Sequence, residues 1–196
     1  AQAVSDRGSV VLMAQWTTSS SAYGGWYHER LPSRPLNLAD RRQSNVPAAA
    51  APAVAAKKPQ SLLDMLETYR LRERCVRGDG NCQFRALSDQ LYNTEEHHAS
   101  VREQVVAQLQ SNSGRYKGFV DRSFEAYVRE MSCDGCWGDH VTLQAAADTF
   151  GAQIHVFADS LMDSFIDVTP HVAKSKKVLQ LSFWSEIHYN SLEVLQ

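Results

Sequence analysis

From residue 61 onward, the hydrophobic and polar positions mostly follow a helical pattern. Ser61, with the acidic Asp64 three residues later, is an N-cap signal, and it predicts a helix from residue 61 to about residue 74. The apolar face expected for this helix consists of Leu62, Leu63, Leu66 and Tyr69. Apolar residues spaced by three and four predict further helices beginning near Cys82 and at the capping box of Ser100, around 124–131, and over 142–150 before Gly151.

Near the C-terminal end the pattern changes to alternation of apolar and polar residues. This alternation predicts strands over residues 153–157, 164–168 and 178–183, followed by a further extended segment around His188. Helices followed by a few strands are typical of an α+β fold with a small C-terminal sheet.

Residues 1–59 have a different character from the rest of the chain. A Thr/Ser run at 17–21 and an Ala/Pro stretch at 48–52 give little basis for a packed core, so we expect a disordered N-terminal arm before a folded domain over 60–196. Residues 10–13 have the composition of a short strand. Trp16, Tyr23, Trp26 and Tyr27 form an aromatic cluster that fits either a partner-binding patch or local packing, and local packing is the simpler interpretation.

Net charge and cysteine content indicate which partners and which cellular compartment to expect. The net charge of −2 is evenly spread, so the sequence favours neither a nucleic acid nor a membrane surface as partner. No apolar run approaches the ~20 residues of a spanning helix. The four cysteines are irregularly spaced, unlike a disulfide framework. We therefore expect a reducing compartment, the cytoplasm first and the nucleus second.

The segment GDGNCQFRAL at residues 78–87 delivers one cysteine to the start of a predicted helix. At that position the aligned peptide dipoles favour the thiolate of Cys82. The turn that contains Gly80 and Asn81 also offers backbone N–H groups that can bind an oxyanion. The segment therefore suits a thiol nucleophile that needs a base from elsewhere in the chain.

His188 is the candidate base, and Asn190 lies two residues after it. In an extended segment residues i and i+2 point to the same side, so the amide of Asn190 can orient the imidazole of His188. A thiol, a histidine and an orienting amide are the components of a thiol-protease site.

The motifs DGNC at 79–82 with FRA at 84–86, WGD at 137–139 and HYNS at 188–191 resemble, in this order, the ovarian-tumour (OTU) cysteine proteases of the plant-like type. The resemblance implies a papain-like α+β fold and hydrolysis of peptide and isopeptide bonds at the C-terminal glycine of ubiquitin. It implies Cys82 as nucleophile, His188 as general base and acid, and Asn190 as orienting group. Asp79 is similar to the motif aspartate of the family, which lies in the loop beside the nucleophile and is counted with the catalytic set, and which can also shape the turn and the oxyanion site.

The resemblance also implies partners and a cleft. The expected partners are ubiquitin, polyubiquitin chains and ubiquitinated proteins, and neither a metal nor an organic cofactor is implied. Trp137 and Asp139 belong to a block that borders the active-site cleft in the family, although capping of the following helix already explains Asp139.

Several alternatives remain open at this point. The domain can bind ubiquitin without catalysing hydrolysis, or Cys133 and Cys136 can form a redox or zinc site, although a zinc site normally needs four ligands. Cys75 is a second thiol near the nucleophile turn, and His155 is the base candidate if His188 fails.

Overall fold

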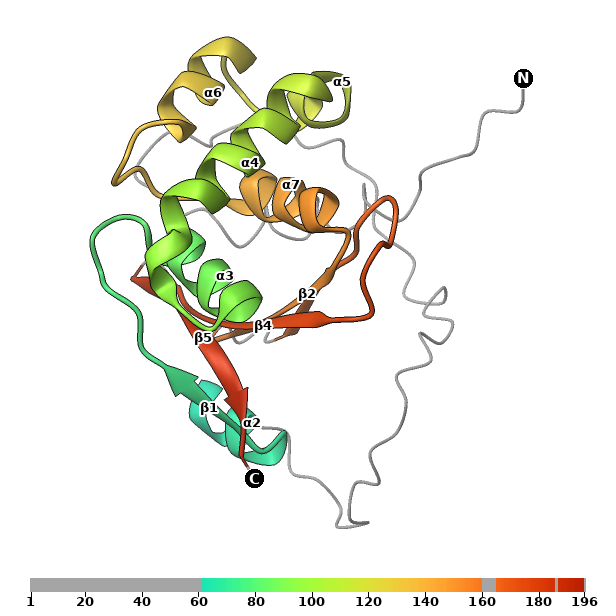
Figure 1. Cartoon of the computed structure of the whole chain (residues 1–196). Helices are drawn as coiled ribbons and strands as arrows, with labels where there is room; N and C mark the ends of the chain where they lie inside the picture. Colours follow the sequence, from blue (N-terminus) through green and yellow to red (C-terminus); the bar gives the residue numbers. More distant parts are fainter. Residues whose placement is uncertain (1–60, 160–164, 186, 196) are drawn as a thin grey trace, which may run out of the picture.

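The structure is a computed structural model that describes residues 61–159, 165–185 and 187–195. Our predictions for the N-terminal arm, the strand at 10–13 and the aromatic cluster therefore lie outside the described residues. Helices and strands occur in the order α2 (Leu62–Thr68), β1 (Leu71–Arg74), α3 (Cys82–Tyr92), η2 (Glu95–His97), α4 (His98–Ser111), α5 (Ser113–Tyr116), η3 (Lys117–Phe119), α6 (Phe124–Met131), α7 (His140–Phe150), β2 (Gln153–Ala158), β3 (Phe165–Val168), β4 (Val178–Trp184) and β5 (His188–Val194) (Figure 1).

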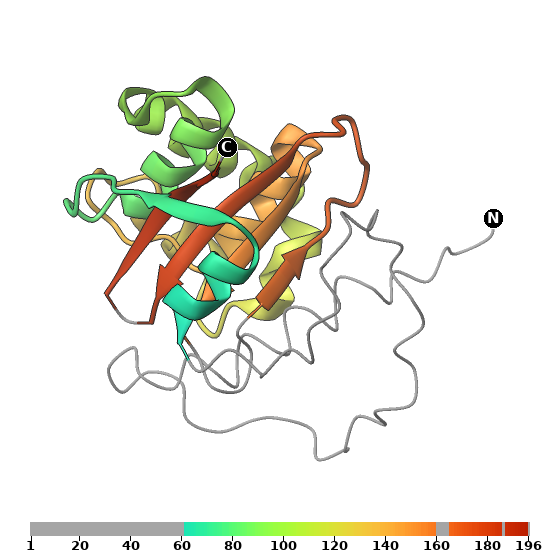
Figure 2. The same cartoon turned by 90° about the horizontal axis from the view of Figure 1, so that it is seen from below.

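The strands form one mixed sheet in the order β1-β5-β4-β2-β3. β2 and β4 are parallel, and the other neighbouring pairs are antiparallel. Helix α2 lies on one face of the sheet, while α3, α4 and α7 are stacked over the other face (Figure 2). This arrangement confirms the predicted α+β class.

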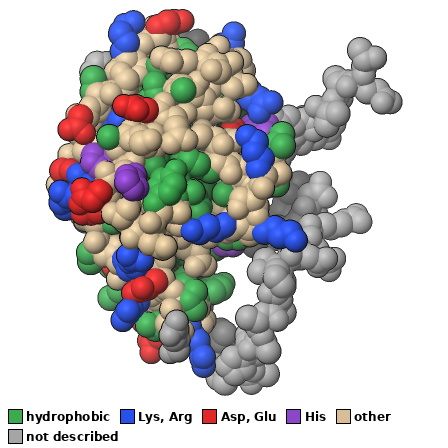
Figure 3. Space-filling view, in the orientation of Figure 1, with side chains coloured by type: hydrophobic (Ala, Val, Ile, Leu, Met, Phe, Trp, Pro, Cys, Tyr) green, Lys and Arg blue, Asp and Glu red, His purple; other side chains and the backbone are tan. Residues whose placement is uncertain are grey.

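Two hydrophobic clusters hold these layers together. The larger cluster fills the space between the sheet and α3, α4 and α7, and its fully buried members include Phe84, Leu109, Leu143 and Ile154. The smaller cluster fixes α2 and β1 to the opposite face through Leu62, Met65, Leu66, Leu71, Phe157 and Leu192. On the surface shown in Figure 3, acidic and basic side chains are both scattered around a central group of hydrophobic ones.

Most predicted elements are confirmed, with four corrections. The helix predicted over 61–74 ends at Thr68, because Arg70 adopts a left-handed conformation (φ 53°) and Leu71–Arg74 pairs with β5. Leu63 and Tyr69 of its predicted apolar face are exposed, and Met65 is buried in their place. Helix α4 begins at His98 rather than at the Ser100 capping box. Finally, one strand, β1, lies between α2 and α3, so the sheet is not built from C-terminal segments alone.

Candidate active site

Cys82 is the first residue of α3, as predicted, and its side chain is buried. The turn before it packs directly on the loop at residues 133–136. Gly80 has a φ of +82°, and a Cβ there would lie 2.0 Å from the carbonyl oxygen of Gly135. Only glycine allows this close backbone approach, so the position of the nucleophile turn depends on Gly80.

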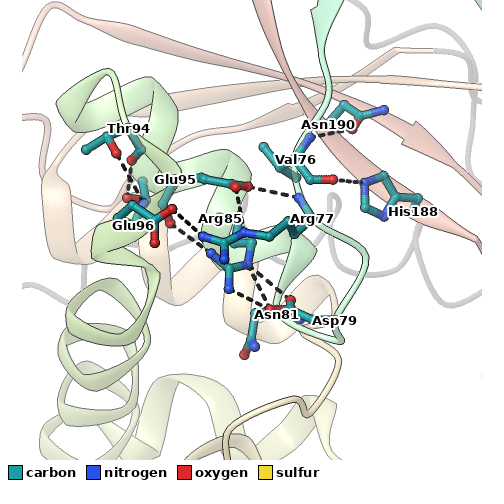
Figure 4. Close-up of polar contacts among 11 residues, drawn as sticks. Val76, Arg77, Asp79, Asn81, Arg85, Thr94, Glu95, Glu96, His188 and Asn190 are labelled. Atoms are coloured by element: carbon teal, nitrogen blue, oxygen red, sulfur yellow. Dashed lines mark hydrogen bonds and ion pairs between the residues drawn. The ribbon is translucent and has the colours of Figure 1, made fainter.

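Asp79 stabilises the same turn through its carboxylate. Its Oδ1 accepts a hydrogen bond from the backbone N–H of Asn81 at 3.1 Å, and its Oδ2 lies 2.5 Å from Nη2 of Arg85 (Figure 4). The hydrogen bond from Arg85 holds the pKa of Asp79 well below its usual range, even though desolvation opposes this shift. These contacts give Asp79 a role in shaping the turn, and its catalytic role stays a prediction.

Asn81 anchors the turn from the other side. Its Oδ1 accepts hydrogen bonds from the backbone N–H of Gly135 at 3.0 Å and from Nη2 of Arg102 at 2.6 Å. Because the backbone N–H of Asn81 already donates to Asp79, it is not one of the free N–H groups that we expected for an oxyanion. Gly80 and Asn81 therefore build the turn.

Arg102 is a supporting residue that the sequence did not indicate. Its buried guanidinium donates to the carbonyls of Met131 and Cys136 at 2.9 and 2.7 Å as well as to Asn81, and it stacks on the ring of Phe84 at 4.0 Å. Burial lowers the pKa of Arg102. The residue joins α4, the 133–136 loop and the nucleophile turn, and only the tertiary contacts distinguish it from the other arginines of the predicted helices.

The ionisation of Cys82 differs from our expectation. Backbone N–H groups of Tyr189, Gln83 and Cys82 itself favour the thiolate, as predicted for a helix start. Burial opposes them and is the larger effect, so the pKa of Cys82 is raised. In the free protein the helix start therefore favours the thiolate of Cys82, but burial outweighs it and the net pKa is raised.

His188 is the first residue of β5, and its side chain lines the same pocket as Cys82. The other residues of this pocket are Trp137, Gly138, Phe183, Ile187 and Tyr189. Nε2 of His188 lies 3.1 Å from the carbonyl oxygen of Val76, which can only accept a hydrogen bond (Figure 4). This contact selects the tautomer with the proton on Nε2 and leaves Nδ1 as the basic nitrogen.

Asn190 does not contact His188 in the way that we predicted. Its Oδ1 accepts from the backbone N–H of Val76 at 3.2 Å, and its Nδ2 donates to Oε1 of Glu73 at 3.2 Å. The direct acceptor for Nε2 of His188 is thus the carbonyl of Val76. Asn190 instead accepts from the backbone N–H of Val76, which belongs to the preceding peptide unit. The reason is that β1 and the segment after it run beside β5, a pairing that was not visible in the sequence.

The two predicted cleft residues have different positions. Trp137 lines the pocket and is 45% exposed. Asp139 caps α7 through a capping box with Thr142 and accepts from the hydroxyl of Tyr127 at 2.8 Å, so its observed contacts are structural. Between them, a Cβ on Gly138 would lie 2.2 Å from Oε1 of Gln83, the residue after the nucleophile.

In the described part of the chain, the structure gives no contacts that favour the alternative nucleophile, the alternative base or the zinc site. Cys75 is exposed, and His155 lies in β2, 3.9 Å from Asp167 and in edge-on contact with Phe165. Within the described ranges no group of three or more His, Cys, Asp or Glu side chains is arranged to hold a metal ion, so the zinc reading of Cys133 and Cys136 lacks further ligands. None of the helices over these residues has the length and hydropathy needed to cross a membrane.

A helix-borne cysteine and a strand-borne histidine in one pocket define a thiol-protease type of site. The family model described as OTU-like cysteine protease matches residues 77–195, which is more than half of the chain. The chain belongs to this family.

Several relatives from Arabidopsis thaliana are similar to this chain. OVARIAN TUMOR DOMAIN-containing deubiquitinating enzyme 9 is 44% identical over 161 residues, which are 78% of this chain and 47% of the relative. The corresponding enzyme 12 is 50% identical over 137 residues, which are 70% of this chain and 63% of the relative. The chain therefore spans about half to two thirds of the length of these relatives.

Solved structures confirm the fold. The OTU domain of OTUD1 superposes with a TM-score of 0.60 at 22% identity, covering 66% of this chain and 89% of that one. An OTU domain in complex with ubiquitin superposes with a TM-score of 0.53 at 19% identity, covering 62% and 69%. These similarities establish the papain-like OTU architecture that the motifs implied.

Proposed function

We propose that this chain is a deubiquitinase that hydrolyses the peptide or isopeptide bond at the C-terminal glycine of ubiquitin. The observation that carries the proposal is the shared pocket of Cys82 and His188, two residues from opposite ends of the folded domain. Membership of the OTU-like cysteine proteases and the naming of its relatives as deubiquitinating enzymes support the substrate class.

In the first step, Nδ1 of His188 accepts the proton of the Cys82 thiol while Nε2 keeps its proton on the carbonyl of Val76. The sulfur attacks the glycine carbonyl carbon, and a tetrahedral oxyanion forms. The C–N bond to the lysine amine then breaks, and the imidazolium gives its proton to the leaving amine. A thioester of ubiquitin remains on Cys82.

In the second step, water attacks the thioester and gives a proton to His188, and the C–S bond breaks. The imidazolium returns this proton to the sulfur of Cys82, and the glycine carboxyl releases its own proton to solvent and leaves as the carboxylate. We place the oxyanion at the start of α3, where the backbone N–H of Cys82 lies at the positive end of the helix. We do not assign this role to the backbone N–H of Asn81, because it donates to Asp79.

We assign the recognition of the ubiquitin tail to the mouth of the pocket. Trp137 is 45% exposed and Ile187 is 67% exposed, and both are pocket-lining residues that offer apolar contact to an extended peptide. Ubiquitin bound to other OTU domains supports ubiquitin as a partner. Polyubiquitin chains and ubiquitinated proteins follow as substrates from the same assignment.

The raised pKa of Cys82 favours one second candidate, a ubiquitin-binding module that is inactive because the thiol stays protonated. A ubiquitin probe with a C-terminal electrophile separates the two functions. We expect covalent labelling of the parent chain, loss of labelling in Cys82→Ala, and unchanged labelling in the control Cys75→Ala. Ubiquitin binding without labelling would establish the module, and neither binding nor labelling would overturn both proposals.

We also propose the cytoplasm, with the nucleus as a second compartment, because a free catalytic thiol requires reducing conditions. Fractionation of cells that express the protein, with detection by antibody, tests this location. Recovery of the protein mainly from an oxidising compartment would contradict it.

A further inference from the structure

A single carboxylate oxygen connects three strands beside the site. Oε1 of Glu73, on β1, accepts hydrogen bonds from the hydroxyl of Ser182, from Nε1 of Trp184 at 2.8 Å and from Nδ2 of Asn190 at 3.2 Å. Ser182 and Trp184 belong to β4, and Asn190 belongs to β5. Ser182 is directly opposite Asn190 in the β4–β5 pairing, which places these side chains on one face of the sheet.

The contact between Glu73 and Asn190 determines which way the amide of Asn190 points. The carboxylate of Glu73 only accepts hydrogen bonds, and the backbone N–H of Val76 only donates. With Nδ2 on Glu73 and Oδ1 on Val76, both ends of the amide are satisfied, whereas a flipped amide would lose both hydrogen bonds. Glu73 therefore fixes the acceptor end of Asn190 toward Val76.

Val76 connects Asn190 to the imidazole of His188. The backbone N–H of Val76 is held by Asn190, and the carbonyl of Val76 contacts Nε2 of His188 (Figure 4). Asn190 thus fixes the peptide unit that precedes the one whose carbonyl meets the ring, which limits how far Val76 can shift from His188. A continuous path of hydrogen bonds thus runs from Glu73 through Asn190 and Val76 to His188.

We infer that Glu73 is a positioning residue for His188, acting through Asn190 and the main chain of Val76. The inference rests on the proposed function, because it assigns His188 as the base. In this role Glu73 touches neither the substrate nor the reacting atoms. It keeps the proton of the imidazole on Nε2, so that Nδ1 is available for the thiol of Cys82.

Kinetics of Glu73→Ala test this role, with Glu193→Ala as the matched control. Glu193 is also a glutamate of the β1–β5 strand pair, but its partner is Arg72 at 2.5 Å. We expect kcat on a ubiquitin substrate to fall about tenfold in Glu73→Ala, because Asn190 loses the one hydrogen bond that orients its amide, with KM changed less than about twofold. Glu73→Gln keeps a carbonyl acceptor and should recover most of kcat, and Glu193→Ala should match the parent.

A spectroscopic measurement is independent of activity. In the full chain carrying Cys82→Ala, the ¹⁵N shifts of the His188 ring should report the Nε2–H tautomer, and adding Glu73→Ala should produce a mixture of tautomers. This readout remains available even if the chain proves not to be a deubiquitinase. An unchanged tautomer in a folded Glu73→Ala protein overturns the inference, and so does an unchanged kcat in an active one.

A double-variant comparison asks whether Glu73 acts through Asn190, with kcat taken per folded protein so that poor folding of a variant does not count as a loss. If it does, then Glu73→Ala combined with Asn190→Ala should be no slower than Asn190→Ala alone. If the two losses in kcat multiply instead, Glu73 acts by another route and the inference fails.

Discussion

The imidazole of His188 and the main-chain carbonyl of Val76 lie 3.1 Å apart across the gap between β5 and the segment that follows β1. A backbone carbonyl cannot rotate or titrate in the way a side chain can, so it is a fixed acceptor for the ring. In this protein the orientation of the candidate base therefore depends on the position of the main chain just after β1, and Asn190 contributes by accepting from the N–H of Val76.

Asn190→Asp should be harmful although it is nearly isosteric. The new carboxylate can still accept from Val76, but it faces the carboxylate of Glu73 instead of donating to it. We expect a loss of ~1–3 kcal/mol in the free energy of unfolding, because a buried donor is replaced by a like charge. Urea denaturation measures the loss. The double variant with Glu73→Gln should recover part of it, and equal stability of Asn190→Asp and the parent would contradict the assigned contact.

Gly80→Ala should disrupt the nucleophile turn. The added Cβ would lie 2.0 Å from a backbone oxygen of Gly135, and the positive φ of Gly80 is unfavourable for alanine. We expect a cost of roughly 1–3 kcal/mol and a strong loss of labelling by a ubiquitin probe. Gly114→Ala is the control, because nothing lies within 4 Å of its Cβ position. Comparable effects of both substitutions on thermal unfolding would rule out the close approach as the cause.

Asp79→Asn should weaken the protein in a pH-dependent way. The pKa of Asp79 is lowered in the folded state, mainly by Arg85, so its stabilising contribution is present above the unfolded pKa of about 3.9 and is lost as the pH falls toward the folded value. The stability difference between parent and Asp79→Asn should therefore be largest at neutral pH and shrink below about pH 4. Urea denaturation at pH 7 and pH 3 checks this, and a difference that grows in acid would be incompatible with the ion pair.

Alkylation of Cys82 should be slow at neutral pH. Burial raises the pKa of its thiol, and only the thiolate reacts with iodoacetamide. We expect the rate at Cys82, followed by peptide mass spectrometry, to rise continuously beyond about pH 8.5, the ordinary value for a free thiol. The exposed Cys75 provides a reference for an accessible thiol in the same sample. A rate at Cys82 that is already constant at pH 7 would instead indicate a preformed thiolate.

Local sequence signals were sufficient to predict helix α3, which carries the candidate nucleophile, and helix α7. Helix α3 begins at Cys82 because a glycine-containing turn precedes an apolar-periodic segment, and α7 begins at the cap of Asp139 and ends at the left-handed Gly151. These features depend on residues within a few positions of each other, so the sequence contains the necessary information.

Long-range pairing decided the parts that we predicted wrongly. Leu71–Arg74 has the composition of a helix end, but β5 offers it a hydrogen-bonding edge, and the chain becomes β1. The ionisation of Cys82 depends on how completely the folded chain removes water from the thiol, which the helix start alone does not reveal.

The sequence by itself determined the candidate residues of this site: a thiol at a helix start, a histidine in a C-terminal extended segment and the motifs of an OTU cysteine protease. The tertiary structure decided which groups support them, namely the carbonyl of Val76, the buried Arg102 and the carboxylate of Glu73. The physical reason is that reactive residue types and caps are local properties. The acceptor for an imidazole or the anchor of a loop is whichever group the packing of distant strands and helices brings within hydrogen-bonding distance.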